Sequence, residues 1–178
     1  MTVVLLWLIL AVPTLIIISI VWPGIIGAPW IPSTRAEVRR MLTLAHVQPG
    51  ERVYDLGSGD GRVLIAVARE FDAEAIGVEA DLLRWLWTQA RVRLLNLRGP
   101  LTGHVRVIWG NLFEADLRTA DVVIVYLRQD TNTRLMHKLW RELRPGARVI
   151  SNTYIFPGRE AARVDTEGAP IYCYEIEG

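Results

Sequence analysis

The stretch RVYDLGSGDGR, residues 52–62, passes from a strand-like pattern through a glycine-rich loop into a helix-like pattern. The apolar run ends at Asp55-Leu56, and three glycines follow within five positions: Gly57, Gly59 and Gly61. A strand that turns through glycines into a helix is the first unit of many open α/β sheets, which bind ligands at the carboxyl ends of their strands. The loop therefore indicates both an architecture and a place for a ligand.

The rest of the chain repeats this alternation. Strand-like runs lie at 52–56, 75–79, 104–109, 121–126 and 147–153, and helix-like runs lie at 61–71, 81–97 and 131–143. Strands that alternate with helices predict a parallel sheet covered on both faces. The last residues, 163–178, are typical of two strands around a Gly-Ala-Pro turn, an antiparallel hairpin at the edge of the sheet. The predicted fold is α/β and Rossmann-like, mostly parallel, with this hairpin at its end.

Composition excludes several classes of protein. The 178 residues carry 20 basic and 19 acidic side chains, and a net charge of +1 argues against a nucleic-acid partner. The single cysteine excludes an internal disulfide. The three histidines show no spacing typical of metal ligands, so no metal site is predicted.

The N-terminal segment is apolar, and the first charged residue is Arg35. Residues 3–22 are mostly Leu, Ile and Val, and twenty helical residues span about 30 Å, the thickness of a bilayer core. The run is too long for a signal peptide and lacks a basic start. We therefore predict a single transmembrane helix in contact with the lipid bilayer. The arginines at 35, 39 and 40 follow it, which puts the remaining domain on the cytoplasmic side.

The glycine spacing discriminates between cofactors. A dinucleotide site needs G-x-G-x-x-G, but here Arg62 takes the sixth position. Asp55, just before the loop, would repel a pyrophosphate and would attract a cation instead. The ammonium group in the methionine part of S-adenosyl-L-methionine is such a cation. A purely structural turn stays open as the alternative.

Acidic and amide residues follow the next two predicted strands. Glu79 lies about 20 residues after Gly59, where an acidic side chain can accept hydrogen bonds from both ribose hydroxyls. Asn111 follows the third strand, where its amide could bind the adenine edge or cap a helix.

Four segments carry a resemblance: YDLGSGDGR, GVEAD, GNLF and RPGARVIS. Together they resemble class I S-adenosylmethionine-dependent methyltransferases and, more narrowly, the small protein-lysine methyltransferases typified by the ATP synthase c-subunit lysine methyltransferase family. The resemblance covers about Pro29 to Phe156. It implies a Rossmann-like sheet, S-adenosyl-L-methionine as cofactor, and a cofactor site made of Asp55, Gly57, Ser58, Gly59, Gly61, Glu79, Asn111 and Leu112. Relatives commonly carry an aspartate where this chain has Asn111.

Methyl transfer from a sulfonium to an amine is an in-line displacement that needs neither a metal nor a covalent intermediate, so the protein mainly aligns donor and acceptor. Tyr126 ends the fourth predicted strand beside the expected sulfonium. With Asp130 and Asn132 it is the predicted catalytic wall. A core role for Tyr126 and a helix-capping role for Asp130 and Asn132 remain open. Here the chain reads VYLRQDTN, unlike the Asn-Pro-Pro-Tyr motif of many amine methyltransferases.

The predicted organisation has three parts: a transmembrane anchor over 1–27, a linker and first soluble helix over 28–48, and a methyltransferase domain over 49–178. The predicted function is N-methylation of an exposed lysine, with a membrane-embedded protein as substrate. A small-molecule or lipid methyltransferase and a cofactor-binding scaffold without catalysis are the alternatives. A nicotinamide-dependent reductase is disfavoured by the glycine spacing.

Overall fold

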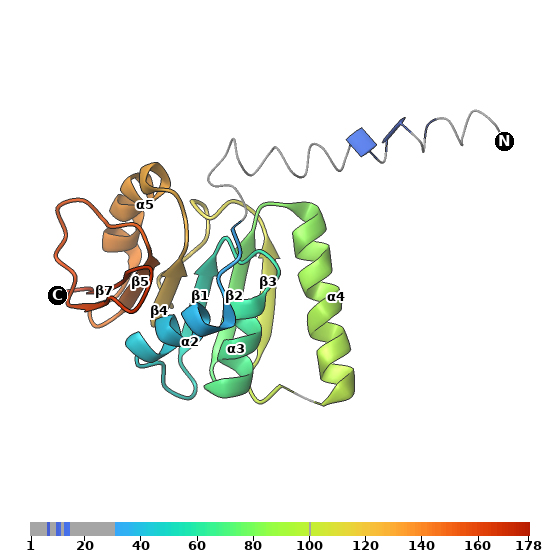
Figure 1. Cartoon of the computed structure of the whole chain (residues 1–178), viewed down its shortest axis with the longest axis horizontal. Coiled ribbons are helices and arrows are strands. Elements are labelled where there is room, and N and C mark those ends of the chain that lie inside the picture. Colours follow the sequence, from blue (N-terminus) through green and yellow to red (C-terminus); the bar gives the residue numbers. More distant parts are fainter. Residues whose placement is uncertain (1–6, 8–9, 12, 15–30, 100) are drawn as a thin grey trace.

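The computed structural model describes residues 7, 10–11, 13–14, 31–99 and 101–178. They contain a seven-stranded sheet in the order β3-β2-β1-β4-β5-β7-β6, with helices on both faces (Figure 1). The strands are β1 (Arg52–Leu56), β2 (Glu74–Glu79), β3 (Val105–Trp109), β4 (Val122–Val125), β5 (Arg148–Asn152), β6 (Arg163–Asp165) and β7 (Ile171–Glu175). The helices that we discuss are α2 (Arg35–Leu44), α3 (Arg62–Glu70), α4 (Leu82–Arg98) and α5 (Gln129–Glu142).

Strand pairing confirms the predicted Rossmann-like fold. Strands β1 to β5 pair in parallel, whereas β7 runs antiparallel to β5 and β6 antiparallel to β7. From β1 the chain moves outward to β2 and β3, then returns to place β4 on the other side of β1. This reversal of direction between β1 and β4 creates the crevice in which such sheets bind ligands.

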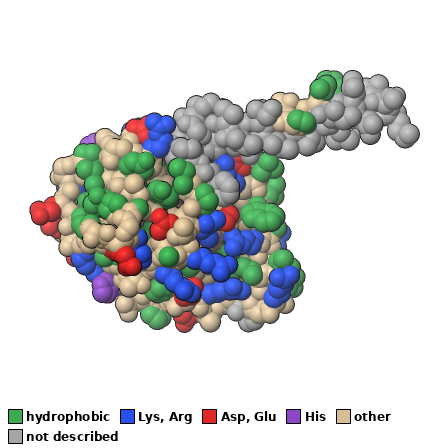
Figure 2. All heavy atoms as spheres, viewed as in Figure 1, with side chains coloured by type: hydrophobic (Ala, Val, Ile, Leu, Met, Phe, Trp, Pro, Cys, Tyr) green, Lys and Arg blue, Asp and Glu red, His purple; other side chains and the backbone are tan. Residues whose placement is uncertain are grey.

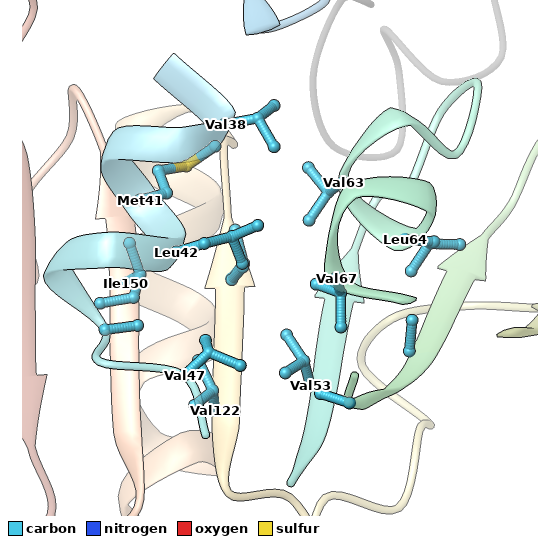
Figure 3. Packing of buried hydrophobic residues seen from close by; sticks show 14 of the residues in the cluster. Val38, Met41, Leu42, Val47, Val53, Val63, Leu64, Val67, Val122 and Ile150 are labelled. Carbon is cyan, nitrogen blue, oxygen red and sulfur yellow. The ribbon is translucent and has the colours of Figure 1, made fainter. Parts of the chain in front are cut away.

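Two hydrophobic cores lie on opposite faces of the sheet. On one face α2 and α3 pack their apolar sides together over β1, β4 and β5, with Met41, Leu42 and Val67 among the labelled side chains (Figure 3). On the other face Leu135 and Leu139 of α5 belong to the second core. The central strands are buried on both faces, which explains their nearly continuous apolar sequences.

Helix α2 begins with the capping box that the sequence predicts. The Glu37 amide donates to the Thr34 hydroxyl over 3.2 Å, and the Thr34 amide donates to the Glu37 carboxylate over 2.5 Å. Arg40 also donates to both carboxylate oxygens of Asp165 in β6, over 2.9 and 2.8 Å. Helix α2 therefore contacts both α3, the next helix in the sequence, and the hairpin at the C-terminal end of the chain.

Helix α4 covers the β3 edge with one side and exposes an apolar side. Only Thr88 and Val92 are buried, and the Trp85 indole donates to the Val107 carbonyl over 3.0 Å. The exposed side, which we call the apolar face of α4, consists of Leu82, Leu83, Leu86, Trp87, Leu94 and Leu97. Figure 2 shows hydrophobic side chains along this edge, next to basic side chains between α3 and α4.

One prediction needs correction. Among the residues that the structure describes, no helix is long and apolar enough to cross a membrane. The longest, α4, has 17 residues and carries four arginines in its sequence. A single-pass membrane location with a cytoplasmic domain is therefore wrong for the described part of the chain. The predicted anchor over 1–27, with its proposed lipid contact at 3–22, lies mostly outside the described residues.

Candidate active site

The glycine-rich loop crosses the carboxyl end of β1 in a conformation that favours glycine. Gly57, Gly59 and Gly61 have φ values of +90°, +55° and +73°. The amides of Gly57 and Ser58 both donate to the Val78 carbonyl, over 2.9 and 3.1 Å. A Cβ on Gly61 would lie 2.4 Å from Cγ2 of Thr88, so α4 packs directly on the loop. The loop's shape therefore depends on the absence of a side chain at position 61.

A cleft opens beside this loop at the carboxyl ends of β1, β2 and β4. Its empty space is about 950 Å³, a value that includes the solvent at its open mouth. Of the predicted site residues it is lined by Asp55, Gly57, Ser58, Gly59, Glu79, Asn111, Leu112 and Tyr126. Gly61 lies at the N-cap of α3 instead.

Glu79 links the loop to the start of α4. Its carboxylate accepts the Gly59 amide over 2.8 Å at one oxygen and the Asp81 amide over 2.9 Å at the other. Burial raises its pKa above the ordinary value, although both backbone hydrogen bonds act to lower it. Each carboxylate oxygen can accept a second hydrogen bond. Glu79 can therefore hold the loop and still bind a hydroxyl group in the cleft.

Asp55 is buried among other acids. Burial, followed by the charges of Glu79 and Asp60, raises its pKa to about 7. Asp60 behaves oppositely: burial acts to raise its pKa, but hydrogen bonds and charges from Arg62 and Arg91 lower it. The Ser58 hydroxyl is buried and has no hydrogen-bond partner among the described atoms. An acid that a cation would stabilise, beside an unpaired hydroxyl, fits the polar methionine end of S-adenosylmethionine.

Asn111 lines the cleft but is also used locally. Its side-chain oxygen accepts the Phe113 amide over 3.1 Å, and its amide nitrogen donates to Glu114 over 3.2 Å. These contacts stabilise the turn after β3; no helix begins there among the described residues, so Asn111 is not a helix cap.

The three predicted catalytic residues occupy three different places. Tyr126 is half-buried and lines the cofactor cleft just after β4. Asp130 is exposed and lies in a neighbouring hollow, 3.3 Å from Arg128. Asn132 is fully buried, and its amide nitrogen donates to the Ser151 hydroxyl over 2.9 Å. Helix α5 begins at Gln129, two residues before the predicted start, and no side chain caps it.

Sequence reasoning missed one wall of the cleft. The segment Ile31–Ser33 lines it, from a part of the chain that precedes α2. Arg62 holds this segment because its guanidinium donates both to the Ser33 carbonyl and to Asp60. Arg84 lines the opposite side, 3.7 Å from Glu79. The loop motif gives no sign of these contacts, because they join segments distant in sequence.

Comparison with known proteins identifies the family. The model of the ANTKMT methyltransferase domain matches residues 55–163. The chain belongs to this family. It is 39% identical over 155 residues to a protein-lysine N-methyltransferase of Saccharolobus islandicus (strain REY15A), covering 83% of this chain and 93% of the relative. It is 30% identical to the mouse adenine nucleotide translocase lysine N-methyltransferase but spans only 64% of that protein.

A solved structure supports the same identification. An RNA methyltransferase from Salinibacter ruber, in complex with S-adenosyl-L-homocysteine, superposes with a TM-score of 0.77 at 34% identity. The match covers 83% of this chain and 94% of that one. This ANTKMT-family protein is an S-adenosylmethionine-dependent methyltransferase, and its homologues include protein-lysine N-methyltransferases.

Proposed function

We propose that this ANTKMT-family enzyme transfers a methyl group to the side-chain amine of a lysine in a protein. The observation that carries the proposal is the cofactor cleft of Asp55 and Glu79 beside an open hollow containing Asp130. The identity to an archaeal relative named as a protein-lysine N-methyltransferase supports the choice of acceptor.

The cofactor residues receive separate roles in this proposal. Asp55 binds the ammonium group, and Glu79 accepts hydrogen bonds from the ribose hydroxyls. The glycines at 57, 59 and 61, with Ser58, let the backbone approach the cofactor closely. Asn111 and Leu112 contact the adenine. S-adenosylmethionine supplies an electrophilic methyl group on its sulfonium when it is bound.

The acceptor must lose a proton before it can react. Lysine has an ordinary pKa of about 10.4, so neutralising it at pH 7 costs about 4.6 kcal/mol. Half-burial beside Tyr126 lowers this cost, because desolvation disfavours the ammonium form. Asp130 attracts the charged amine to the mouth of the site, and buried Asn132 supports the wall from beneath.

We further propose that the substrate is a membrane-embedded protein with its lysine near the polar surface. The apolar face of α4 supports this, since Leu82 and Leu83 are exposed directly after the cleft-lining residues Glu79 and Ala80. Exposed apolar patches commonly mark surfaces that contact apolar partners. The sequence of α4 includes four arginines, and Figure 2 shows basic side chains next to hydrophobic ones on this side of the molecule.

The test incubates the purified protein with native cell fractions and S-adenosylmethionine carrying a radiolabelled methyl group. We expect label in membrane proteins, on lysines that gain one to three methyl groups by mass spectrometry. Label extracted with lipids would support the lipid alternative and contradict a protein acceptor. Binding of S-adenosylhomocysteine with no labelled product in any fraction would indicate a scaffold. The variant Glu79→Ala serves as the unlabelled control.

RNA is a second candidate acceptor because the Salinibacter ruber relative is described as an RNA methyltransferase. A net charge of +1 gives this chain little general attraction for a polyanion. The same labelling experiment decides between them, since ribonuclease would release label from RNA and leave protein-bound label in place.

A further inference from the structure

A strained turn lies next to the proposed acceptor side of the cleft. Thr153, directly after β5, has φ +70°, which is rare for a β-branched residue. The Tyr154 amide donates to the Asn152 carbonyl over 2.8 Å and closes a three-residue turn around Thr153. This is the γ-turn with positive φ, the less common and more strained form. Such strain persists where surrounding contacts enforce it, and it is concentrated at functional sites.

Buried polar side chains enforce the turn from below. The Ser151 hydroxyl donates to the Tyr154 carbonyl over 2.5 Å and accepts the Asn132 amide over 2.9 Å. The Asn132 amide also approaches the Tyr154 carbonyl at 3.4 Å. Asn132, Ser151 and Asn152 are all fully buried. The side-chain network therefore fixes the backbone at Tyr154 to the first turns of α5.

A second attachment lies on the outer side of the turn. The Gln129 side chain donates to the Ile155 carbonyl over 2.9 Å and accepts the Ile155 amide over 3.3 Å. Because Tyr154 lies between these two attachments, its backbone is held at one place beside α5. The tyrosine side chain on this backbone carries an apolar ring and a hydroxyl that can both donate and accept.

Tyr154 lines the hollow beside the cofactor cleft. Arg128, Gln129, Asp130, Thr133 and Tyr154 line the hollow. Tyr126 and Leu127, the two residues before Arg128, line the cofactor cleft. The linings of the cleft and the hollow are therefore consecutive along the chain after β4, with Leu127 in one and Arg128 in the other.

We propose that Tyr154 and Asp130 form the subsite for the acceptor amine, and that Asn132 positions Tyr154 within it. The inference rests on the proposed function and adds residues to it. Asp130 attracts the ammonium form. Arg128, whose Nε lies 3.3 Å from Oδ1 of Asp130, favours release of the ammonium proton to the solvent that reaches both exposed side chains. The Tyr154 hydroxyl then accepts a hydrogen bond from the neutral amine and orients the nitrogen lone pair toward the cleft. Asn132 never touches the substrate in this arrangement.

Binding of an amine can be measured separately from turnover. The full-length protein, saturated with S-adenosylhomocysteine, is titrated with N-acetyl-lysine methylamide while backbone NMR shifts are followed. We expect shifts at residues 128–133 and 154–155, and a dissociation constant about tenfold larger for Tyr154→Phe, as loss of one hydrogen bond predicts. Tyr172→Phe is the matched control, because Tyr172 lies on β7 outside the hollow.

Asn132→Ala tests the positioning role. It should weaken amine binding several-fold and leave the dissociation constant of S-adenosylhomocysteine unchanged, whereas a purely structural role would lower the melting temperature without this selective loss. Absence of shifts around the hollow in the parent protein, or equal binding by parent and Tyr154→Phe, overturns the subsite. Intact amine binding without any labelled protein lysine would instead overturn the proposed function and leave the subsite standing.

Discussion

The two halves of the sheet's carboxyl edge hold their polar groups in different ways. Beside β1 and β2, buried carboxylates and backbone amides are locked together, as in the Glu79 contacts to Gly59 and Asp81. Beside β4 and β5, the groups that face the hollow are exposed side chains such as Asp130, supported by buried neighbours such as Asn132. The first half suits a cofactor that is always the same, whereas the second half can accommodate a substrate that approaches from outside.

The largest effect should come from the glycine loop. Gly61→Ala introduces a side chain at φ +73° and 2.4 Å from Cγ2 of Thr88. We expect the free energy of unfolding to fall by about 3 kcal/mol from backbone strain and overpacking together, with loss of cofactor binding. Chemical denaturation measures the first and calorimetric titration the second.

Gly50→Ala is the control for this prediction. Gly50 has φ +80°, yet an added Cβ would have no neighbour within 4 Å. It should therefore lose only about 1–2 kcal/mol, the conformational part alone. Equal losses for the two variants would show that contact with α4 does not shape the loop.

Replacing single carboxylates should distinguish the cofactor half of the sheet's carboxyl edge from the acceptor half. Asp55→Ala and Glu79→Ala should each weaken S-adenosylhomocysteine binding by tenfold or more, because each leaves buried polar partners unpaired, about 1–3 kcal/mol. Asp130→Ala should change that affinity by less than about twofold, because its side chain is 65% exposed and ion-paired outside the cleft. Calorimetric titration of the three variants checks both statements, and tight binding by both cleft variants would contradict the site.

The raised pKa of Asp55 predicts a pH dependence confined to the cofactor half. In the free protein its pKa is about 7, so below that pH the carboxyl is protonated and must lose a proton to pair with an ammonium group. Affinity for S-adenosylhomocysteine should therefore rise about tenfold from pH 6 to pH 8. Asp55→Asn should bind more weakly with a flat profile, and a steep profile in that variant would assign the titration to another group.

The raised pKa of Asp55 also affects folding, and here a higher pH is unfavourable. Because the folded state holds the Asp55 proton more tightly than the unfolded state, this group lowers stability progressively as pH rises from about 4 to about 7. At pH 8 Asp55→Asn should therefore melt at a higher temperature than the parent, and the difference should shrink toward pH 4.

The smallest effect concerns the acceptor half. Thr153→Gly relieves the positive φ of +70° but gives the unfolded chain more freedom, so a net stabilisation of about 0.5 kcal/mol is expected. Thermal denaturation measures it. Thr43→Gly, in the last turn of α2, lacks such strain and should instead be destabilising by about 0.5–1 kcal/mol.

The two halves also differ in how much of them the sequence predicts. The strands are predicted to within about a residue because their apolar runs are local, and Asp55, Glu79 and Tyr126 reach the cleft because each lies at the carboxyl end of a strand. The sequence places Asn132 in the predicted catalytic wall but indicates neither its full burial nor any role for Tyr154. Their contacts join α5 to the turn after β5, and nothing local reveals a positive φ at a threonine.

Arg62 marks a boundary of the cleft that the family model leaves out. Its guanidinium joins the glycine loop to Ser33, so residues 31–33 close one side of the cleft. The family match begins only at residue 55. A protein trimmed to begin at residue 36 would keep the whole region that the family model matches, residues 55–163, and all seven strands. It would nevertheless leave the bound nucleoside open to water on that side, so trimming for expression should stop short of position 31.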